Sequence, residues 1–313
     1  MKHIHSDSPI LEIDSNHYKL LAQLAVGKKL ISPTRSIRAD NMSVVIPVKN
    51  NQKGIDLFLQ TLVKNCDKSS YPREIIIVDN NSSAKLKISK TYPFPVKVLY
   101  CKKQGPAAAR NIGASEVTGD WILFTDSDCR ATKTLVSGYC TDTNECIAYA
   151  GMIEVIGRDV FSRFYRESNT LLPRYFKTSS DLVPWTIVTA NCLVYREAFV
   201  ESGGFNEKFK YAGGEDTDLG LRLIKLGKIK YKFDSIAQHI FDDGLDGLIN
   251  RFMRYGRGQW LLHQIYKCES LSVDGSIKTA LYDNADQFLN HIAESAFCWG
   301  YAAEAFKEDL IAF

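Results

Sequence analysis

The sequence contains no apolar run long enough to cross a bilayer, and its first residues, "MKHIHSDSPILEID", lack the charged-then-apolar order of a secretory signal. We therefore expect a cytoplasmic protein, with peripheral contact to the inner face of a membrane as an alternative for its aromatic and basic C-terminal segments. The net charge of +3 is close to balanced. This argues against a protein that coats nucleic acid, so only local basic clusters remain to bind an anionic ligand.

The eight cysteines include no Cys-x-x-Cys pair and do not have the spacing of a zinc site or of a secreted disulfide framework. We expect them to be reduced thiols that mostly pack in the core. Internal repeats and low-complexity tracts are also absent. No Gly-x-Gly-x-x-Gly motif follows the first predicted strand, which disfavours a nicotinamide dehydrogenase.

What the sequence does contain is an alternation of apolar, β-branched runs with helical segments. The run "MSVVIPVKN" is typical of a strand buried on both faces of a parallel sheet, and "EIIIVD", "VKVLY" and "WILFTD" are expected as further strands. Helices are expected over residues 56–65 and from "GPAAARNIGASE", and further strands at 149–156 and 186–195. This order predicts an α/β fold with a Rossmann-like, mostly parallel sheet flanked by helices.

We divide the chain into three parts by composition. Residues 1–41 form a polar N-terminal appendage, in which Leu20, Leu21, Leu24 and Ala25 define a short helical stripe. Residues 42–244 carry the α/β pattern, and residues 245–313 are expected to form a helical C-terminal region.

Polar residues follow three of the predicted strands. Asn50 follows the first strand, residues 79–82 the second, and residues 126–128 the strand that begins at Trp121. Ligands of open parallel sheets bind beyond the carboxyl ends of the strands, so these residues should meet in one crevice. There Asp79 is expected either to accept a hydrogen bond from a uracil-like base or to cap a turn with its neighbours.

Asp126 and Asp128 are separated by one residue at the end of a strand. In an extended strand, side chains two apart point to the same side, so both carboxylates can face one cation. Carboxylate oxygens with few other ligands suit Mg²⁺ or Mn²⁺. The alternative is a turn in which Asp126 caps a helix that begins near Ala131.

Gly105 and Pro106 precede a helix whose first turns carry Arg110 and Asn111. Backbone donors and a guanidinium would then lie near an anionic or nucleotide ligand. The alternative is an ordinary helix that starts with proline and exposes its arginine.

A second acidic site lies in "YAGGEDTDLGLRLIKLG", where leucines at 219, 223 and 226 predict a helix that stops at Gly227. Glu215 and Asp216 occupy its first turn, where carboxylates complement the helix dipole. In the functional alternative, an exposed Asp216 kept ionised by that dipole takes a proton from an acceptor hydroxyl.

A third group of residues comes from "IAQHIFDDG" and "LINRFMRYGRGQW". His239 is either a neutral ligand of the cation or a structural histidine. Arg251 and Arg254 share a predicted helical face and Arg257 follows one turn later, to meet either a diphosphate or solvent. The glycines at 256 and 258 weaken this helix, which favours a mobile segment.

Taken in order, "VVIPVKN", "EIIIVDNNS", "GPAAARNIG", "WILFTDSDC", "TANCLVYREAFVESGGFNE", "GGEDTDLGLRLIKLG" and "QH" resemble the family 2 glycosyltransferases of GT-A fold. The likeness extends roughly from residue 42 to 263, and the ordered set is specific although no single motif is. A fainter likeness is to glycosyltransferases that modify peptide-derived redox cofactors such as mycofactocin. "VDNNS" departs from the second acidic residue usual in the family, and no clear "QxxRW" follows His239, which argues against a processive synthase.

The resemblance implies an inverting, metal-dependent transfer of sugar from a nucleotide-diphosphate sugar, with UDP as the expected carrier and Mn²⁺ or Mg²⁺ as cofactor. The catalytic residues that it implies are Asp216, as base, and Glu215. The implied metal ligands are Asp128, as the more direct ligand, Asp126 and His239. The implied donor-binding residues are Pro47, Asn50, Asp79, Asn81, Gly105, Arg110, Asp126, Arg254 and Arg257.

The acceptor stays open among a glycan, a lipid-linked sugar, a peptide and a small molecule. Two other functions also need a nucleotide crevice: a sugar nucleotidyltransferase and a non-catalytic module that binds nucleotide sugars. The first would leave the nucleotide on the sugar, and the second would bind donor without turnover.

Overall fold

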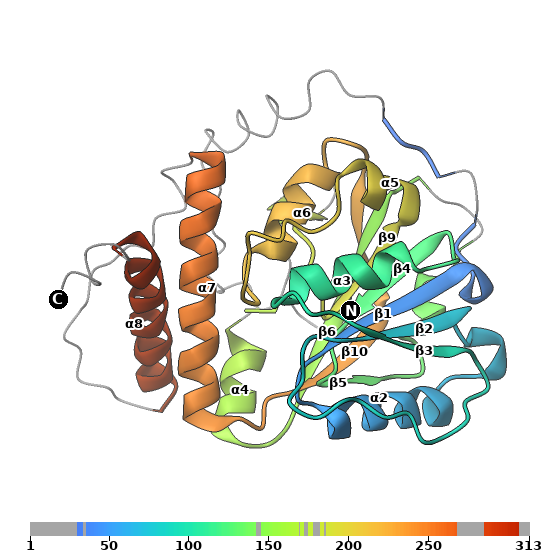
Figure 1. Cartoon of the computed structure of the whole chain (residues 1–313). Helices are drawn as coiled ribbons and strands as arrows, with labels where there is room; N and C mark the ends of the chain where they lie inside the picture. The colour runs from blue at the N-terminus through green and yellow to red at the C-terminus, as the bar shows by residue number, and fades with distance from the viewer. Residues whose placement is uncertain are drawn as a thin grey trace.

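The computed structural model describes residues 30–33, 36–141, 145–168, 170–171, 175–177, 182–184, 186–267 and 285–306. An eight-stranded sheet forms its centre, with helices on both faces and a pair of long helices at one end (Figure 1). The strand order is β3-β2-β1-β4-β9-β6-β10-β5. The strands are β1 (Met42–Val48), β2 (Glu74–Asp79), β3 (Val96–Tyr100), β4 (Trp121–Thr125), β5 (Cys129–Ala131), β6 (Ala148–Ile156), β9 (Asn191–Tyr195) and β10 (Ile229–Ile240).

The helices are α2 (Gln52–Asn65), α3 (Pro106–Ser115), α4 (Val160–Glu167), α5 (Arg196–Glu201), α6 (Glu215–Leu223), α7 (Gly244–Tyr266) and α8 (Ala285–Ala305). Short 3-10 turns lie at η1 (Ala39–Asn41), η2 (Lys68–Ser70) and η3 (Ser137–Tyr139), and a small hairpin pairs β7 (Tyr175–Lys177) with β8 (Leu182–Pro184). Among the described residues, no helix is long and apolar enough to cross a membrane.

Both faces of the central strands β1, β2 and β4 are buried, which explains their continuous apolar runs, whereas the edge strand β3 is half-exposed. On β1, Val44 and Ile46 belong to the core under α2, whereas Val45 belongs to the core under α3. This alternation places successive side chains in opposite layers. The predicted α/β fold is therefore confirmed, with a helical region after β10.

The sheet is mixed rather than purely parallel. The pairs β1-β2, β1-β4, β2-β3 and β6-β10 are parallel, as expected for βαβ units. β9 lies antiparallel between β4 and β6, and β5 lies antiparallel to the end of β10. The helix considered near Ala131 is absent there, because residues 129–131 pair with β10 instead.

Helix bounds differ from the predicted ones at two places. α2 starts four residues early, at Gln52, because the Asn51 side chain accepts a hydrogen bond from Gly54 N at 2.9 Å and caps it. α6 ends at Leu223 rather than at Leu226. The predicted helical stripe at 20–25 lies outside the described residues.

α7 and α8 lie side by side and cross through two glycines (Figure 1). A Cβ on Gly256 would lie 1.9 Å from Phe297 O, and one on Gly300 would lie 1.9 Å from Met253 O. The sequence predicted a weakened, mobile segment at the glycines 256 and 258. In the structure α7 continues through both positions, and Gly256 permits close helix packing, while mobility of this segment stays a prediction.

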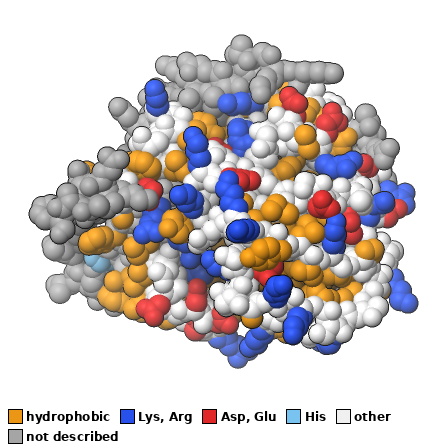
Figure 2. Space-filling model, viewed as in Figure 1, with side chains coloured by type: hydrophobic (Ala, Val, Ile, Leu, Met, Phe, Trp, Pro, Cys, Tyr) orange, Lys and Arg blue, Asp and Glu red, His pale blue; other side chains and the backbone are white. Residues whose placement is uncertain are grey.

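Basic, acidic and hydrophobic side chains are interspersed on the face drawn in Figure 2, in keeping with the nearly balanced charge.

Candidate active site

A cavity of about 760 Å³ lies between the sheet and helices α4, α7 and α8. Residues that end β4, open α6 and end β10 line one part of it. In this part the structure brings together six of the predicted site residues: Arg110, Asp126, Asp128, Glu215, Asp216 and His239. The cavity also includes Arg254 from α7.

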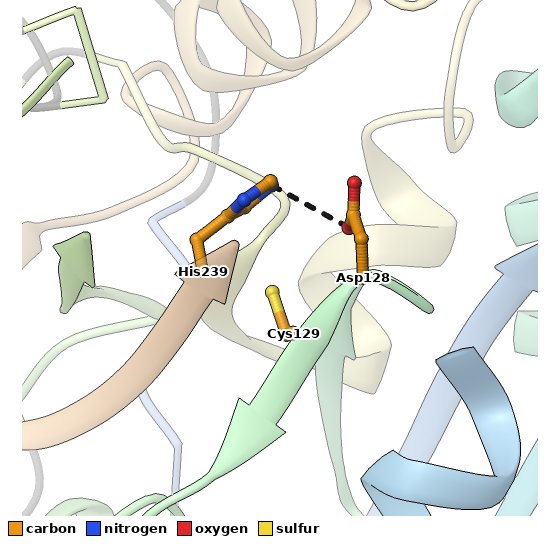
Figure 3. Close-up of side chains that lie close together, drawn as sticks. All are labelled: Asp128, Cys129 and His239. Carbon is orange, nitrogen blue, oxygen red and sulfur yellow. Dashed lines mark ion pairs between the residues drawn. The ribbon is translucent and has the colours of Figure 1, made fainter. Parts of the chain in front are cut away.

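The residues that suit a cation meet where β5 pairs with β10. The antiparallel register sets His239 opposite Cys129, with Asp128 just before β5. His239 Nε2 lies 3.4 Å from Asp128 Oδ1, and the three possible ligand atoms lie within 4.8 Å of one another (Figure 3). This grouping includes Cys129, which sequence reasoning missed because the register of a three-residue strand leaves no pattern.

The chemistry of this cluster fits a divalent cation. Nδ1 of His239 lies 3.1 Å from Ile240 O, and a carbonyl only accepts, so Nδ1 is the donor in this contact and Nε2 is the nitrogen left to face a cation. Asp128 Oδ1 is inaccessible to solvent and makes no hydrogen bond, and His239 Nε2 approaches it at 3.4 Å. A buried carboxylate oxygen with no hydrogen bond is costly, and a cation between it and the imidazole would satisfy it. Phe241, stacked 4.2 Å from the His239 ring, fixes the orientation of the imidazole.

Asp126 lies apart from this cluster. Its Oδ1 accepts a hydrogen bond from Arg110 Nη2 at 2.7 Å, and Arg110 Nη1 donates to Glu215 Oε1 at 2.9 Å. Arg110 is only 3% exposed, so the alternative of an exposed arginine is wrong. Burial acts to lower the pKa of Arg110, but Asp126 and Glu215 raise it and keep the group cationic. Metal binding by Asp126 stays a prediction.

Asp216 sits in the first turn of α6, after a turn that requires glycine. Gly214 has φ +88°, and Gly213 N donates to Glu215 Oε2 at 2.6 Å. Burial first, and then the Glu215 charge, raise the pKa of Asp216 to about 7. The sequence predicted an exposed carboxylate kept ionised by the helix dipole. In the structure Asp216 is half-buried, and desolvation outweighs the dipole.

The polar residues after β1 and β2 are engaged with each other and do not line this cavity in the described part of the chain. Asp79 is buried and accepts from Ser82 N at 2.9 Å and Leu86 N at 3.3 Å, which is the turn-capping alternative. The other predicted donor residues outside the cavity are Pro47, Asn50, Asn81, Gly105 and Arg257. Donor binding by all of these residues stays a prediction.

The three arginines of α7 have different surroundings. Arg251 is buried, donates to Tyr165 OH at 2.6 Å and to Asp243 Oδ2 at 2.7 Å, and is therefore structural. Arg257 stacks over the Tyr211 ring at 5.1 Å. Arg254 lines the cavity, and its buried Nε has no hydrogen-bond partner. Arg254 is therefore the arginine of α7 that best suits an anionic ligand.

Comparison with known proteins gives a consistent picture. Residues 43–203 match glycosyl transferase family 2, and residues 177–239 match the N-terminal domain of galactosyltransferase. A pre-mycofactocin glycosyltransferase of Mycobacterium tuberculosis is 26% identical over 69% of this chain and 46% of its own length. An uncharacterized glycosyltransferase of Haemophilus influenzae is 35% identical over 28% of this chain and 29% of its own length. The chain thus spans less than half the length of these relatives.

Two solved structures share the fold. GalNAc-T7 with UDP, GalNAc and Mn²⁺ has a TM-score of 0.54 at 19% identity, over 89% of this chain and 58% of that one. The mannosyltransferase PcManGT from Pyrobaculum calidifontis, in complex with GDP-Man and Mn²⁺, has a TM-score of 0.53 at 16% identity, over 95% and 82%. With the family match covering half of its length and the GT-A arrangement of its sheet, this chain belongs to glycosyltransferase family 2.

Proposed function

We propose that the protein is an inverting glycosyltransferase that moves a hexosyl or N-acetylhexosaminyl group from a nucleotide-diphosphate sugar to an acceptor hydroxyl. A UDP-sugar is the expected donor. The observation that carries this proposal is that one cavity holds two separate acidic sites. Asp128 with His239 suits a cation, and Asp216 suits proton transfer. The two structural neighbours, solved with Mn²⁺ and with UDP or GDP-Man, support a nucleotide-bound donor and a divalent cation.

In this reaction the acceptor oxygen bonds to the anomeric carbon as the bond from that carbon to the diphosphate breaks. Asp216 takes the proton of the acceptor hydroxyl, and its pKa of about 7 suits a base that works near neutral pH. Because nucleophile and leaving group are on opposite sides, the anomeric configuration inverts. The negative charge leaves with the nucleoside diphosphate.

Asp128 and His239 would hold Mn²⁺ or Mg²⁺, which when bound supplies charge stabilisation at the diphosphate. Arg254, whose Nε lacks a partner, adds a positive charge toward the same group. Glu215 already binds Arg110 and Gly213 N, so its role is to orient the turn that carries Asp216.

The test is release of free nucleoside diphosphate from UDP-glucose, UDP-N-acetylglucosamine and GDP-mannose, with and without Mn²⁺. We expect Asp216→Asn to reduce release at least 100-fold while Mn²⁺-dependent UDP binding stays within about threefold. His239→Ala should weaken Mn²⁺ activation by at least about 10- to 100-fold, the loss that changing an outer-shell partner of a metal ligand already causes. Cys129→Ser should change it little, because Mn²⁺ prefers oxygen and nitrogen ligands.

Each rival function gives another result in the same assay. A nucleotidyltransferase would leave the nucleotide on the sugar and release no nucleoside diphosphate. A binding module would bind UDP without turnover of any donor. Loss of UDP binding in Asp216→Asn would contradict the role assigned to that residue.

A further inference from the structure

Arg110 occupies the centre of the acidic part of the cavity, where three segments of the chain meet. It comes from α3, and its two terminal nitrogens bind Asp126, after β4, and Glu215, at the start of α6. The Phe205 ring lies 5.5 Å from the guanidinium carbon. With both terminal nitrogens engaged and the side chain buried, Arg110 is poorly placed to contact a nucleoside. Contact with the nucleoside is the role that the family resemblance had implied for it.

The contact with Glu215 extends to the turn that carries the proposed base. One carboxylate oxygen of Glu215 binds Arg110, and the other accepts from Gly213 N at 2.6 Å. Glu215 thus joins α3 to the backbone just before Asp216. A shift of Arg110 would move this turn relative to the end of β4.

The next residue of α3 holds the same segment at a second point. The Asn111 side chain donates to Phe205 O at 2.9 Å and accepts from Phe205 N at 2.8 Å, pairing with the backbone of that residue. It also donates to Glu207 Oε1 at 2.9 Å. Adjacent residues of one helix therefore fix the segment before α6, Arg110 at the cavity and Asn111 behind it.

We propose that Arg110 is a positioning residue of the transfer reaction, which holds Glu215 and the Asp216 turn in register with the donor side of the cavity at Asp126. This inference rests on the proposed function, because it assigns the alignment of that function's base and donor. Geometry supports it: transfer needs reacting atoms aligned to within a fraction of an ångström, and a two-point guanidinium contact between two rigid elements provides such alignment.

The test compares Arg110→Lys and Arg110→Gln with Arg222→Lys. Arg222 is a matched control because its guanidinium also holds α6, through Asp218 at 2.6 Å and Ser202 O at 2.6 Å, but it does not line the cavity. We expect Arg110→Lys, which keeps the charge but not the two-point contact, to lower kcat at least tenfold with donor KM within about threefold. Arg222→Lys should lower the melting temperature and leave kcat unchanged.

A double variant supplies a second readout. If Arg110 acts through Glu215, then Arg110→Gln with Glu215→Gln should lose no more activity than the worse single variant. UDP binding in the presence of Mn²⁺ is measured for all variants by calorimetry, independently of turnover.

Two results would overturn the inference while the proposed function stands. One is a tenfold rise in donor KM or UDP Kd at unchanged kcat in Arg110→Lys, which would mean donor contact. The other is an equal loss of kcat in Arg110→Lys and Arg222→Lys that follows their melting temperatures. Absence of nucleoside diphosphate release by the wild-type protein with every donor would instead reject the proposed function, and this inference with it.

Discussion

At the scale of single residues, the site is governed by how each carboxylate is paired. Asp126 and Glu215 share the charge of Arg110, Asp128 has a buried oxygen that faces His239 without a hydrogen bond, and Asp216 is desolvated beside Glu215. The same residue type thus serves as counterion, as candidate metal ligand and as candidate base. Strand ends and motif order predicted the acidic residues after β4 and in α6 that gather here, but they also placed Asn50 and residues 79–82 in the same crevice, and these do not line the cavity. The sequence did not predict how these residues pair. The direction of the Arg110 side chain depends on packing that brings it next to Glu215, which is 105 positions away in the chain.

The raised pKa of Asp216 has a measurable consequence for stability. A carboxylate with an unfolded pKa near 3.8 and a folded pKa of about 7 prefers its protonated form in the fold. The wild-type protein therefore loses stability relative to Asp216→Asn as pH rises from about 4 to 7, and the difference is constant above that. We expect the melting temperature of Asp216→Asn to exceed that of wild type at pH 8 by more than at pH 5, in thermal unfolding followed by circular dichroism. An equal difference at both pH values would show that the pKa is not raised.

At the scale of secondary structure, most strands and helices follow from local pattern, including β6, β9 and α6 after β4, but the direction of β9 and the existence of β5 do not. The β-branched runs of β1 and β2 are buried on both faces, which is the arrangement that their composition predicts. β9 runs antiparallel to both of its neighbours, β4 and β6. Its direction depends on pairing between residues far apart in the sequence, which a local pattern does not reveal. The sequence allowed a helix to begin near residue 131. In the structure, residues 129–131 form a strand because they pair with β10.

The crossing of α7 and α8 gives a prediction in which two effects have opposite signs. By helix propensity alone, Gly300→Ala should stabilise α8 by about 1 kcal/mol. The new Cβ would lie 1.9 Å from the carbonyl oxygen of Met253 in α7, which real structures do not tolerate, so the helices must separate. We expect a net loss of about 1–3 kcal/mol in the free energy of unfolding, measured with urea, as for other overpacked contacts. A gain in stability would mean that the two helices are not in close contact.

At the scale of the whole molecule, the cavity is lined both by residues inside the family matches and by residues of helices that follow them in the chain. The family matches end at residue 239, whereas α7 and α8 begin at residues 244 and 285. These two helices and α4 line the cavity and contribute its aromatic part, with Phe164 from α4, Phe252 from α7 and Phe297 from α8. The cation cluster and Asp216 come from the matched part, whereas α7 supplies Arg254 to the donor side. We propose that the aromatic part of the cavity helps to select the acceptor.

Two aromatic residues of α8 test that assignment as a pair. Phe297 lines the cavity, whereas Trp299, two positions along the same helix, is 67% exposed and does not. If loss of an aromatic contact reduces the binding free energy of a ligand by about 1–2 kcal/mol, the ligand binds roughly 5- to 30-fold more weakly. We expect Phe297→Ala to raise the acceptor KM by that factor and to leave acceptor-independent hydrolysis of the donor unchanged, with Trp299→Ala equal to wild type in both assays. If instead Phe297→Ala slows donor hydrolysis as much as transfer, the aromatic part of the cavity binds the donor, and the residues that select the acceptor must lie elsewhere.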